Sequence, residues 1–200
     1  MKNILCYGDS NTWGYIPQGN HTRYSDKIRY PMVLQSLLGH EYTVIEDGLC
    51  GRCICNNYEN SDDSYNGAVD FPRKIQALDK LDYVVLMLGS NDMKDEFNTT
   101  SLEAAIALEN IYINRIYTYF PNAQIIIVAP KVIHKSTFPD FINAEKKSEN
   151  FETDYKIIAD KYNCKFVTLD DIELGADNLH FTNNDHYILA KKLASLIEQC

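Results

Sequence analysis

The chain has 200 residues, of which 45% are hydrophobic and 24% are charged, as is typical of a globular protein with one core. Its 19 basic and 28 acidic residues give a net charge of -9, which argues against nucleic acid and anionic membranes as partners. No stretch approaches the roughly 20 apolar residues that a membrane-spanning helix needs. The apolar run near the N-terminus is too short for a signal peptide, so we expect one uncleaved cytoplasmic domain over residues 1–200.

Short apolar runs alternate along the chain with longer segments of helical periodicity. In chain order the sequence predicts strands at 2–7, 42–45, 83–88, 124–128 and 165–168, each followed by a helix, at 29–38, 70–78, 101–120, 144–162 and 183–198. Strands that alternate with helices in this way predict a parallel sheet with helices on both faces.

The predicted helix at 101–120 is the longest. We expect Ser101 to be its N-cap and its core-facing residues to follow a period of about 3.6 residues. These core-facing residues are Leu102, Ile106, Ile113, Ile116, Tyr117 and Phe120.

Glycines and polar residues follow each of the first three predicted strands, in the segments 8–11, 48–52 and 89–92. Because the carboxyl ends of parallel strands meet at one sheet edge, we expect these loops to form one site. Ser10 stands near a helix start, which favours negative charge, and is interpreted as a nucleophile. The N–H groups of Ser10 and Gly51 and the side-chain amide of Asn91 would then form an oxyanion hole for acyl transfer.

A serine nucleophile needs a general base and a group that orients this base. Asp177 and His180 stand three residues apart, between the last predicted strand and the last predicted helix. A tight turn would place the carboxylate against one imidazole nitrogen while the other nitrogen faces Ser10. We therefore expect Ser10, His180 and Asp177 to be the catalytic residues. Trp13 is expected either to line the acyl pocket or to anchor its loop in the core.

Other polar residues near these loops have alternative interpretations. Asp9 and Asp92 are interpreted as structural loop residues rather than as participants in catalysis. His134 and His186 are alternative bases, but only His180 has an aspartate three residues before it.

The sequence contains six cysteines, at positions 6, 50, 53, 55, 164 and 200. The close spacing of Cys50, Cys53 and Cys55 is similar to that of a metal clip, but zinc would need a second ligand pair of similar spacing. Cys50 and Cys53 flank Gly51 as alternative nucleophiles, and neither has an identified base. We expect reduced thiols and no metal site.

The motifs occur in the order of the four blocks of the SGNH (GDSL-type) hydrolase family, which the chain resembles from Ser10 to His180. They are Gly8-Asp9-Ser10, the glycine of 48–52, Gly89-Ser90-Asn91-Asp92 and Asp177-Asn178-Leu179-His180. The resemblance implies a flavodoxin-like three-layer α/β/α sandwich with a central five-stranded parallel sheet. It also implies ester hydrolysis without a cofactor, in which Ser10, His180 and Asp177 form the triad and Gly51 and Asn91 are oxyanion donors.

The segments 4–14, 44–49 and 180–182 resemble those of the arylesterase and acyltransferase branch of this family. This branch implies small, acetyl-like acyl esters of alcohols, phenols or sugars, acyl transfer to an alcohol as a second activity, and in some members homo-oligomers. The chain departs from this branch at two places. Cys53 stands where a threonine is common in the branch, and the loop 134–141 shares no motif with it.

Two other functions stay open at this stage. One is a thioesterase or lysophospholipase that acts on longer acyl chains, and the other is a non-catalytic carbohydrate- or lipid-binding module on the same scaffold. The chain lacks the Gly-x-Ser-x-Gly motif of α/β-hydrolases and the glycine-rich phosphate cradle of nucleotide-binding proteins.

Overall fold

The centre of the fold is a parallel sheet with the strand order β2-β1-β3-β4-β5, in a computed structural model that describes residues 1–199. The strands are β1 (Lys2–Gly8), β2 (Tyr42–Gly48), β3 (Tyr83–Met87), β4 (Gln124–Val128) and β5 (Lys165–Val167). All five predicted strands are confirmed; β2 runs three residues beyond the expected end because it pairs with β1 as far as Gly8↔Gly48. The chain turns from β1 to β2 on one side and to β3 on the other, so a crevice opens at the carboxyl end of β1.

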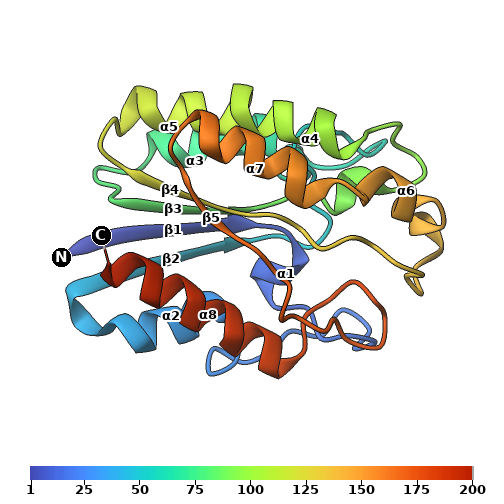
Figure 1. The fold of residues 1–200 in the computed structure, drawn as a ribbon, viewed down its shortest axis with the longest axis horizontal. Coiled ribbons are helices and arrows are strands. Elements are labelled where there is room, and N and C mark those ends of the chain that lie inside the picture. The colour runs from blue at the N-terminus through green and yellow to red at the C-terminus, as the bar shows by residue number, and fades with distance from the viewer. Residues whose placement is uncertain (200) are drawn as a thin grey trace.

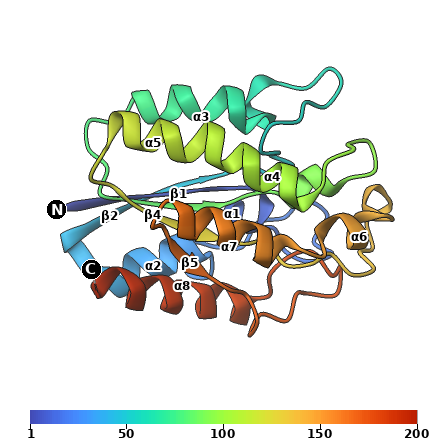
Figure 2. The ribbon, with the colours of Figure 1, turned by 45° about the horizontal axis from the view of Figure 1, so that its top comes forward.

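Helices cover both faces of the sheet (Figures 1 and 2). One face carries α3 (Gly67–Gln76), α4 (Ser101–Ala107), α5 (Asn114–Tyr119) and α7 (Phe151–Lys161), and the other carries α2 (Tyr30–Leu38) and α8 (Asn183–Glu198). Along β1, Leu5 and Tyr7 pack into the core below α3 and α4, while Ile4 and Cys6 pack into the core against α2 and α8. The predicted three-layer α/β/α sandwich is therefore confirmed.

Several short elements surround the carboxyl edge of the sheet. They are α1 (Ser10–Trp13), α6 (Ala144–Ser148) and the 3₁₀ turns Asp63–Tyr65, Asn91–Met93 and Pro139–Phe141, whereas a further 3₁₀ turn, Gly39–Glu41, directly precedes β2 at the opposite edge. The helix expected at 144–162 is divided into α6 and α7 by residues 149–150, and the helix expected to begin at residue 70 begins three residues earlier, where Asn66 caps it.

The N-cap of α4 is Thr100 and not Ser101. The Thr100 hydroxyl accepts a hydrogen bond from the backbone N–H of Glu103, and the Glu103 carboxylate accepts one from the backbone N–H of Thr100. This reciprocal pair is a capping box, and it needs the Glu three residues after the cap, which Ser101 lacks.

The expected core-facing stripe of the long helix is correct in its second half and wrong in its first. Leu102 and Ile106 are 52% and 44% exposed, whereas Ile113 and Ile116 are fully buried. A π-helical turn, Leu108–Ile113, lies between α4 and α5. Such a turn adds a residue and rotates the buried face, so no single 3.6-residue period fits both halves. Within residues 1–199, no helix is long and apolar enough to cross a membrane.

Candidate active site

Ser10, His180 and Asp177 form one hydrogen-bonded row. Ser10 begins α1 directly after β1, and its Oγ lies 2.9 Å from Nε2 of His180. Nδ1 of the same imidazole lies 2.8 Å from Oδ2 of Asp177. The other carboxylate oxygen accepts the backbone N–H groups of Leu179 and His180, at 3.0 and 2.9 Å. The three side chains predicted from the sequence are thus brought together, and all three are buried.

The charge of Asp177 determines which imidazole nitrogen carries the proton. Burial acts to raise the pKa of Asp177, but hydrogen bonds from His180 and Leu179 and attraction to the imidazole outweigh burial and leave this pKa below its ordinary value. The carboxylate is therefore ionised at neutral pH. An ionised carboxylate against Nδ1 holds the proton there and leaves Nε2 free to accept the Ser10 hydroxyl proton.

The row opens into a cavity of about 350 Å³ that Ser10, Gly51, Asn91 and His180 all line. Gly51 has a φ of +86°, in the left-handed region that favours glycine. The Asn91 amide is buried and donates to the backbone carbonyl of Arg52 at 3.2 Å, which fixes the amide beside the Gly51 turn. The three residues predicted to supply oxyanion donors, Ser10, Gly51 and Asn91, thus line one cavity.

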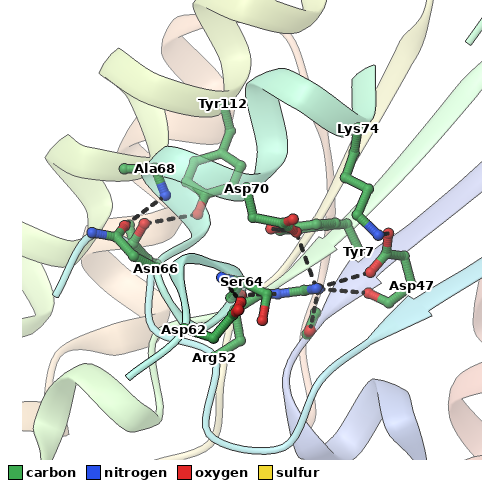
Figure 3. Close-up of polar contacts among 12 residues, drawn as sticks. Tyr7, Asp47, Arg52, Asp62, Ser64, Asn66, Ala68, Asp70, Lys74 and Tyr112 are labelled. Atoms are coloured by element: carbon green, nitrogen blue, oxygen red, sulfur yellow. Dashed lines mark hydrogen bonds and ion pairs between the residues drawn. The ribbon is translucent and has the colours of Figure 1, made fainter. Parts of the chain in front are cut away.

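Arg52 holds the Gly51 turn against the end of β1 (Figure 3). Its buried guanidinium donates to the carboxylates of Asp47 and Asp70, at 2.9 and 3.2 Å, and to the carbonyls of Gly8 and Asp47, at 3.0 and 2.9 Å. Because Gly8 ends β1 two residues before Ser10, Arg52 ties the loop after β2 to the end of the strand that precedes the serine. Arg52 is not among the residues predicted for the site, although its position next to Gly51 in the sequence was a signal for it.

Asn11 and Tyr15 hold His180, and neither is among the residues predicted for the site. The Asn11 amide donates to the carbonyl of Leu179 at 3.1 Å and accepts the N–H of Phe181 at 2.9 Å. The ring of Tyr15 stacks on the imidazole, with 4.2 Å between ring centroids. Asn11 directly follows the serine, which was a local signal, but no sequence pattern connects Tyr15 with a histidine 165 positions away.

Trp13 does not line the cavity. Of its two expected roles, the structure therefore favours the loop anchor over the acyl pocket. The Arg23 guanidinium lies 5.2 Å from the centre of the indole ring, and its Nε donates to the Trp13 carbonyl at 2.6 Å. A Cβ at Gly48 would lie 2.1 Å from the Trp13 nitrogen, so α1 packs directly on the end of β2. Trp13 anchors its loop, and Tyr15 occupies the cavity wall instead.

The alternative bases lie away from the serine. His134 is exposed and pairs with Glu145 at 3.0 Å. His186 is buried in α8, where its Nδ1 accepts the backbone N–H of Tyr30 at 3.3 Å. Neither residue lines the cavity, which leaves His180 as the imidazole beside Ser10.

Asp9 and Asp92 act as loop braces, as expected. Asp9 accepts the N–H of Asn11 at 3.0 Å and caps α1, and Asp92 accepts the N–H of Ile54 and the amide of Asn56, both at 2.8 Å. Burial raises the pKa of Asp9 to about 7 and that of Asp92 to about 6. Asp9 thus braces its own loop, and Asp92 ties the loop after β3 to residues 54–56 of the loop after β2.

The cysteines at 6, 50, 53, 55 and 164 are free thiols, and Cys200 lies outside the described residues. Cys50 lines the cavity, but burial raises the pKa of its thiol to about 12, so the thiolate needed for attack is scarce. Within residues 1–199, no three His, Cys, Asp or Glu side chains are grouped so that they could hold a metal ion.

A Ser-His-Asp row at the carboxyl edge of a parallel sheet, beside a cavity that Gly51 and Asn91 also line, is the arrangement of a serine hydrolase. The chain belongs to the GDSL-like lipase/acylhydrolase family, whose model matches residues 6–187. The predicted family and the predicted class, a carboxylic ester hydrolase, are thereby confirmed.

Two solved structures are similar to this chain over nearly its whole length. The native aryl esterase of M. smegmatis has a TM-score of 0.90 and 28% sequence identity, and the match covers 100% of this chain and 99% of that one. Est24, a carbohydrate acetylesterase from Sinorhizobium meliloti, has a TM-score of 0.88 and 28% identity, with 98% and 100% covered. No curated protein sequence matches the chain.

Proposed function

We propose that this protein is a serine esterase that hydrolyses small, acetyl-like acyl esters of alcohols, phenols or sugars. The observation that carries the proposal is the row Ser10–His180–Asp177, which opens into one cavity with Gly51 and Asn91. The similar aryl esterase and carbohydrate acetylesterase support a small acyl group on a phenol or a sugar.

In the first half of the reaction, Ser10 Oγ attacks the ester carbonyl carbon while His180 Nε2 takes the hydroxyl proton. Asp177 stabilises the imidazolium that forms. The oxygen of the tetrahedral intermediate accepts hydrogen bonds from the N–H groups of Ser10 and Gly51 and from the Asn91 amide. When the carbon–oxygen bond to the alcohol breaks, His180 returns the proton to the leaving oxygen, and an acyl-serine remains.

In the second half, His180 takes a proton from water, and the resulting hydroxide attacks the acyl-serine. The same donors hold the second oxyanion, and the proton passes from His180 to Ser10 as the acid leaves. An alcohol in place of this water would give an acyltransferase. Acyl transfer, a homo-oligomeric state and a cytoplasmic location stay predictions.

The test is hydrolysis of a p-nitrophenyl ester series from acetate to octanoate. We expect the short esters to be the best substrates and Ser10→Ala to lower kcat by at least about 10³-fold. Ser90→Ala is the matched control, because Ser90 lines the same cavity but does not belong to the row.

Each other outcome has a definite meaning. A preference for octanoate would favour the thioesterase or lysophospholipase function. Undiminished turnover by folded Ser10→Ala would contradict the nucleophile. Saturable binding of esters without turnover by the wild type would favour the binding module.

A further inference from the structure

Lys94 places a cation in the wall of the active-site cavity, three residues after Asn91. Its side chain is 15% exposed. Among the described residues that line the cavity, Lys94 is the one lysine or arginine and Asp140 is the one aspartate or glutamate. The reaction proposed above gives neither residue a role.

The present partners of the Lys94 ammonium are weak. Its Nζ lies 4.6 Å from the ring centre of Tyr58 and 5.7 Å from that of Phe141. Ring faces attract an ammonium but do not replace hydrogen-bond acceptors. The nearest Asp140 oxygen is 3.7 Å away, too far for a hydrogen bond, and the Asp140 side chain is 60% exposed, so water can take over its solvation.

The backbone around Lys94 is held independently of this ion pair. The Lys94 N–H donates to the Asn91 carbonyl at 3.2 Å, and the Lys94 carbonyl accepts the ammonium of Lys147 at 2.6 Å. The neighbouring Asp95 N–H donates to the Asp140 carbonyl at 2.7 Å. The Lys94 ammonium can therefore exchange Asp140 for another anion while the backbone of Lys94 stays beside the loop that carries Asn91.

We propose that Lys94 is an anion subsite and that the preferred ester carries a carboxylate or similar anionic group, which replaces Asp140 as the partner of Nζ. The proposal rests on the proposed esterase function, because it names the substrate class of that same cavity. A net charge of -9 repels anions at long range, so the recognition has to come from this local contact.

Two pairs of esters test the proposal and locate the anionic group. In the first pair, 4-nitrophenyl hemisuccinate and its neutral methyl ester place the charge on the acyl side. In the second, 4-acetoxybenzoate and 4-acetoxybenzamide place it on the alcohol side. The readout is the ratio of kcat/KM for the anionic ester to kcat/KM for its neutral counterpart, compared between variants, so that intrinsic ester reactivity cancels.

We expect Lys94→Met to lower this ratio about tenfold for one of the two pairs, because a hydrogen bond to a charged group is lost. Lys94→Arg should retain the ratio, and Asp140→Asn should raise it by removing the competing carboxylate. Lys156→Met removes an equal charge from the exposed face of α7 and should leave the ratio unchanged. An unchanged ratio in Lys94→Met, or an equal fall in Lys156→Met, would overturn the subsite.

A second measurement does not depend on turnover. Ser10→Ala and Ser10→Ala/Lys94→Met are titrated calorimetrically with the same four esters. Tighter binding of the anionic ester only when Lys94 is present supports the subsite, and equal binding overturns it. A wild type that hydrolyses neither pair would contradict the esterase, while these titrations would still decide the subsite.

Discussion

The side chain of Asn11 is hydrogen-bonded to the backbone of Phe181, so the residue that follows Ser10 holds the residue that follows His180. The same amide donates to Leu179, on the other side of the histidine. The distance between Ser10 Oγ and the imidazole therefore depends on one side chain that joins the two ends of the chain.

Replacing Asn11 by Ala should lower kcat about 10–100-fold with a smaller change in KM, because a displaced imidazole loses its alignment with Ser10. The free energy of unfolding should fall by about 2 kcal/mol, because a buried N–H and a buried carbonyl lose their partners. Steady-state kinetics and urea unfolding measure the two effects. Asn122→Ala, in an exposed turn, is the control. A variant with wild-type kcat would show that the loop keeps its position without Asn11.

Tyr58 fixes the peptide group that follows Gly51. Its hydroxyl donates to the Gly51 carbonyl at 2.7 Å, whereas the thiol of Cys53 reaches the same carbonyl at 3.7 Å. Tyr58→Phe keeps the ring beside Lys94 and removes only the hydroxyl. We expect kcat to fall about tenfold through a misplaced oxyanion donor. Cys53→Ala should lower kcat less than Tyr58→Phe does, because a thiol is a weak hydrogen-bond donor. A larger loss of kcat in Cys53→Ala would contradict this expectation.

Arg52 should matter more for stability than any exposed arginine. Arg52→Met leaves the carboxylates of Asp70 and Asp47 beside an apolar side chain, and we expect a loss of about 3–5 kcal/mol in the free energy of unfolding. Arg73→Met breaks an ion pair with Asp63 whose side chains are 66% and 63% exposed, and should cost less than about 1 kcal/mol. Urea unfolding of both variants tests the difference. The double variant Arg52→Met/Asp70→Asn should recover part of the lost free energy of unfolding. If it recovers none, the unpaired charge of Asp70 is not the cause of the loss.

The layers of the fold followed from the sequence because their signals are local. Four of the five strands are mainly apolar runs, whereas the polar end of β2 was missed, and the last helix has the bounds 183–198 that were expected. The core-facing residues of the long helix were predicted wrongly in its first half, because its period changes at the π-helical turn. No residue type in the sequence indicates such a turn. Ser101 and Thr100 are both good caps, and Glu103, three residues after Thr100, decides between them.

The site was predictable to the extent that topology alone brings its residues together. Ser10, Gly51 and Asn91 follow neighbouring parallel strands, and their loops therefore meet at one edge. Tyr15 stacks on His180 through a loop whose course depends on packing, so neither its contact nor the absence of Trp13 from the cavity could be read from spacing. The catalytic roles of these residues stay predictions until Ser10→Ala is measured.

The contribution of His186 to the stability of the protein should fall in mild acid. The residue is fully buried, its Nε2 has no hydrogen-bond partner in the part of the chain described, and burial lowers its pKa from 6.5 to about 4. Between these two values the unfolded chain binds a proton that the folded chain does not. The contribution of His186 to the free energy of unfolding therefore falls with decreasing pH, by about 1.4 kcal/mol per unit and about 3 kcal/mol in total.

Asp9 and Asp92, whose pKa values burial raises to about 7 and about 6, oppose this trend, so the effect of His186 has to be measured as a difference. Burial raises the pKa of Asp9 from 3.8 to about 7, so the folded state gains stability from Asp9 as the pH falls through this range. Urea unfolding of the wild type and His186→Gln from pH 7.5 to pH 4 removes the contributions of Asp9 and Asp92, which both proteins share. The stability of the wild type relative to the variant should decline as the pH falls below about 6.5, by about 3 kcal/mol at pH 4. His40→Gln, in an exposed turn, should follow the wild type. A constant difference between the wild type and His186→Gln across this range would mean that the buried imidazole takes up its proton without unfolding the chain.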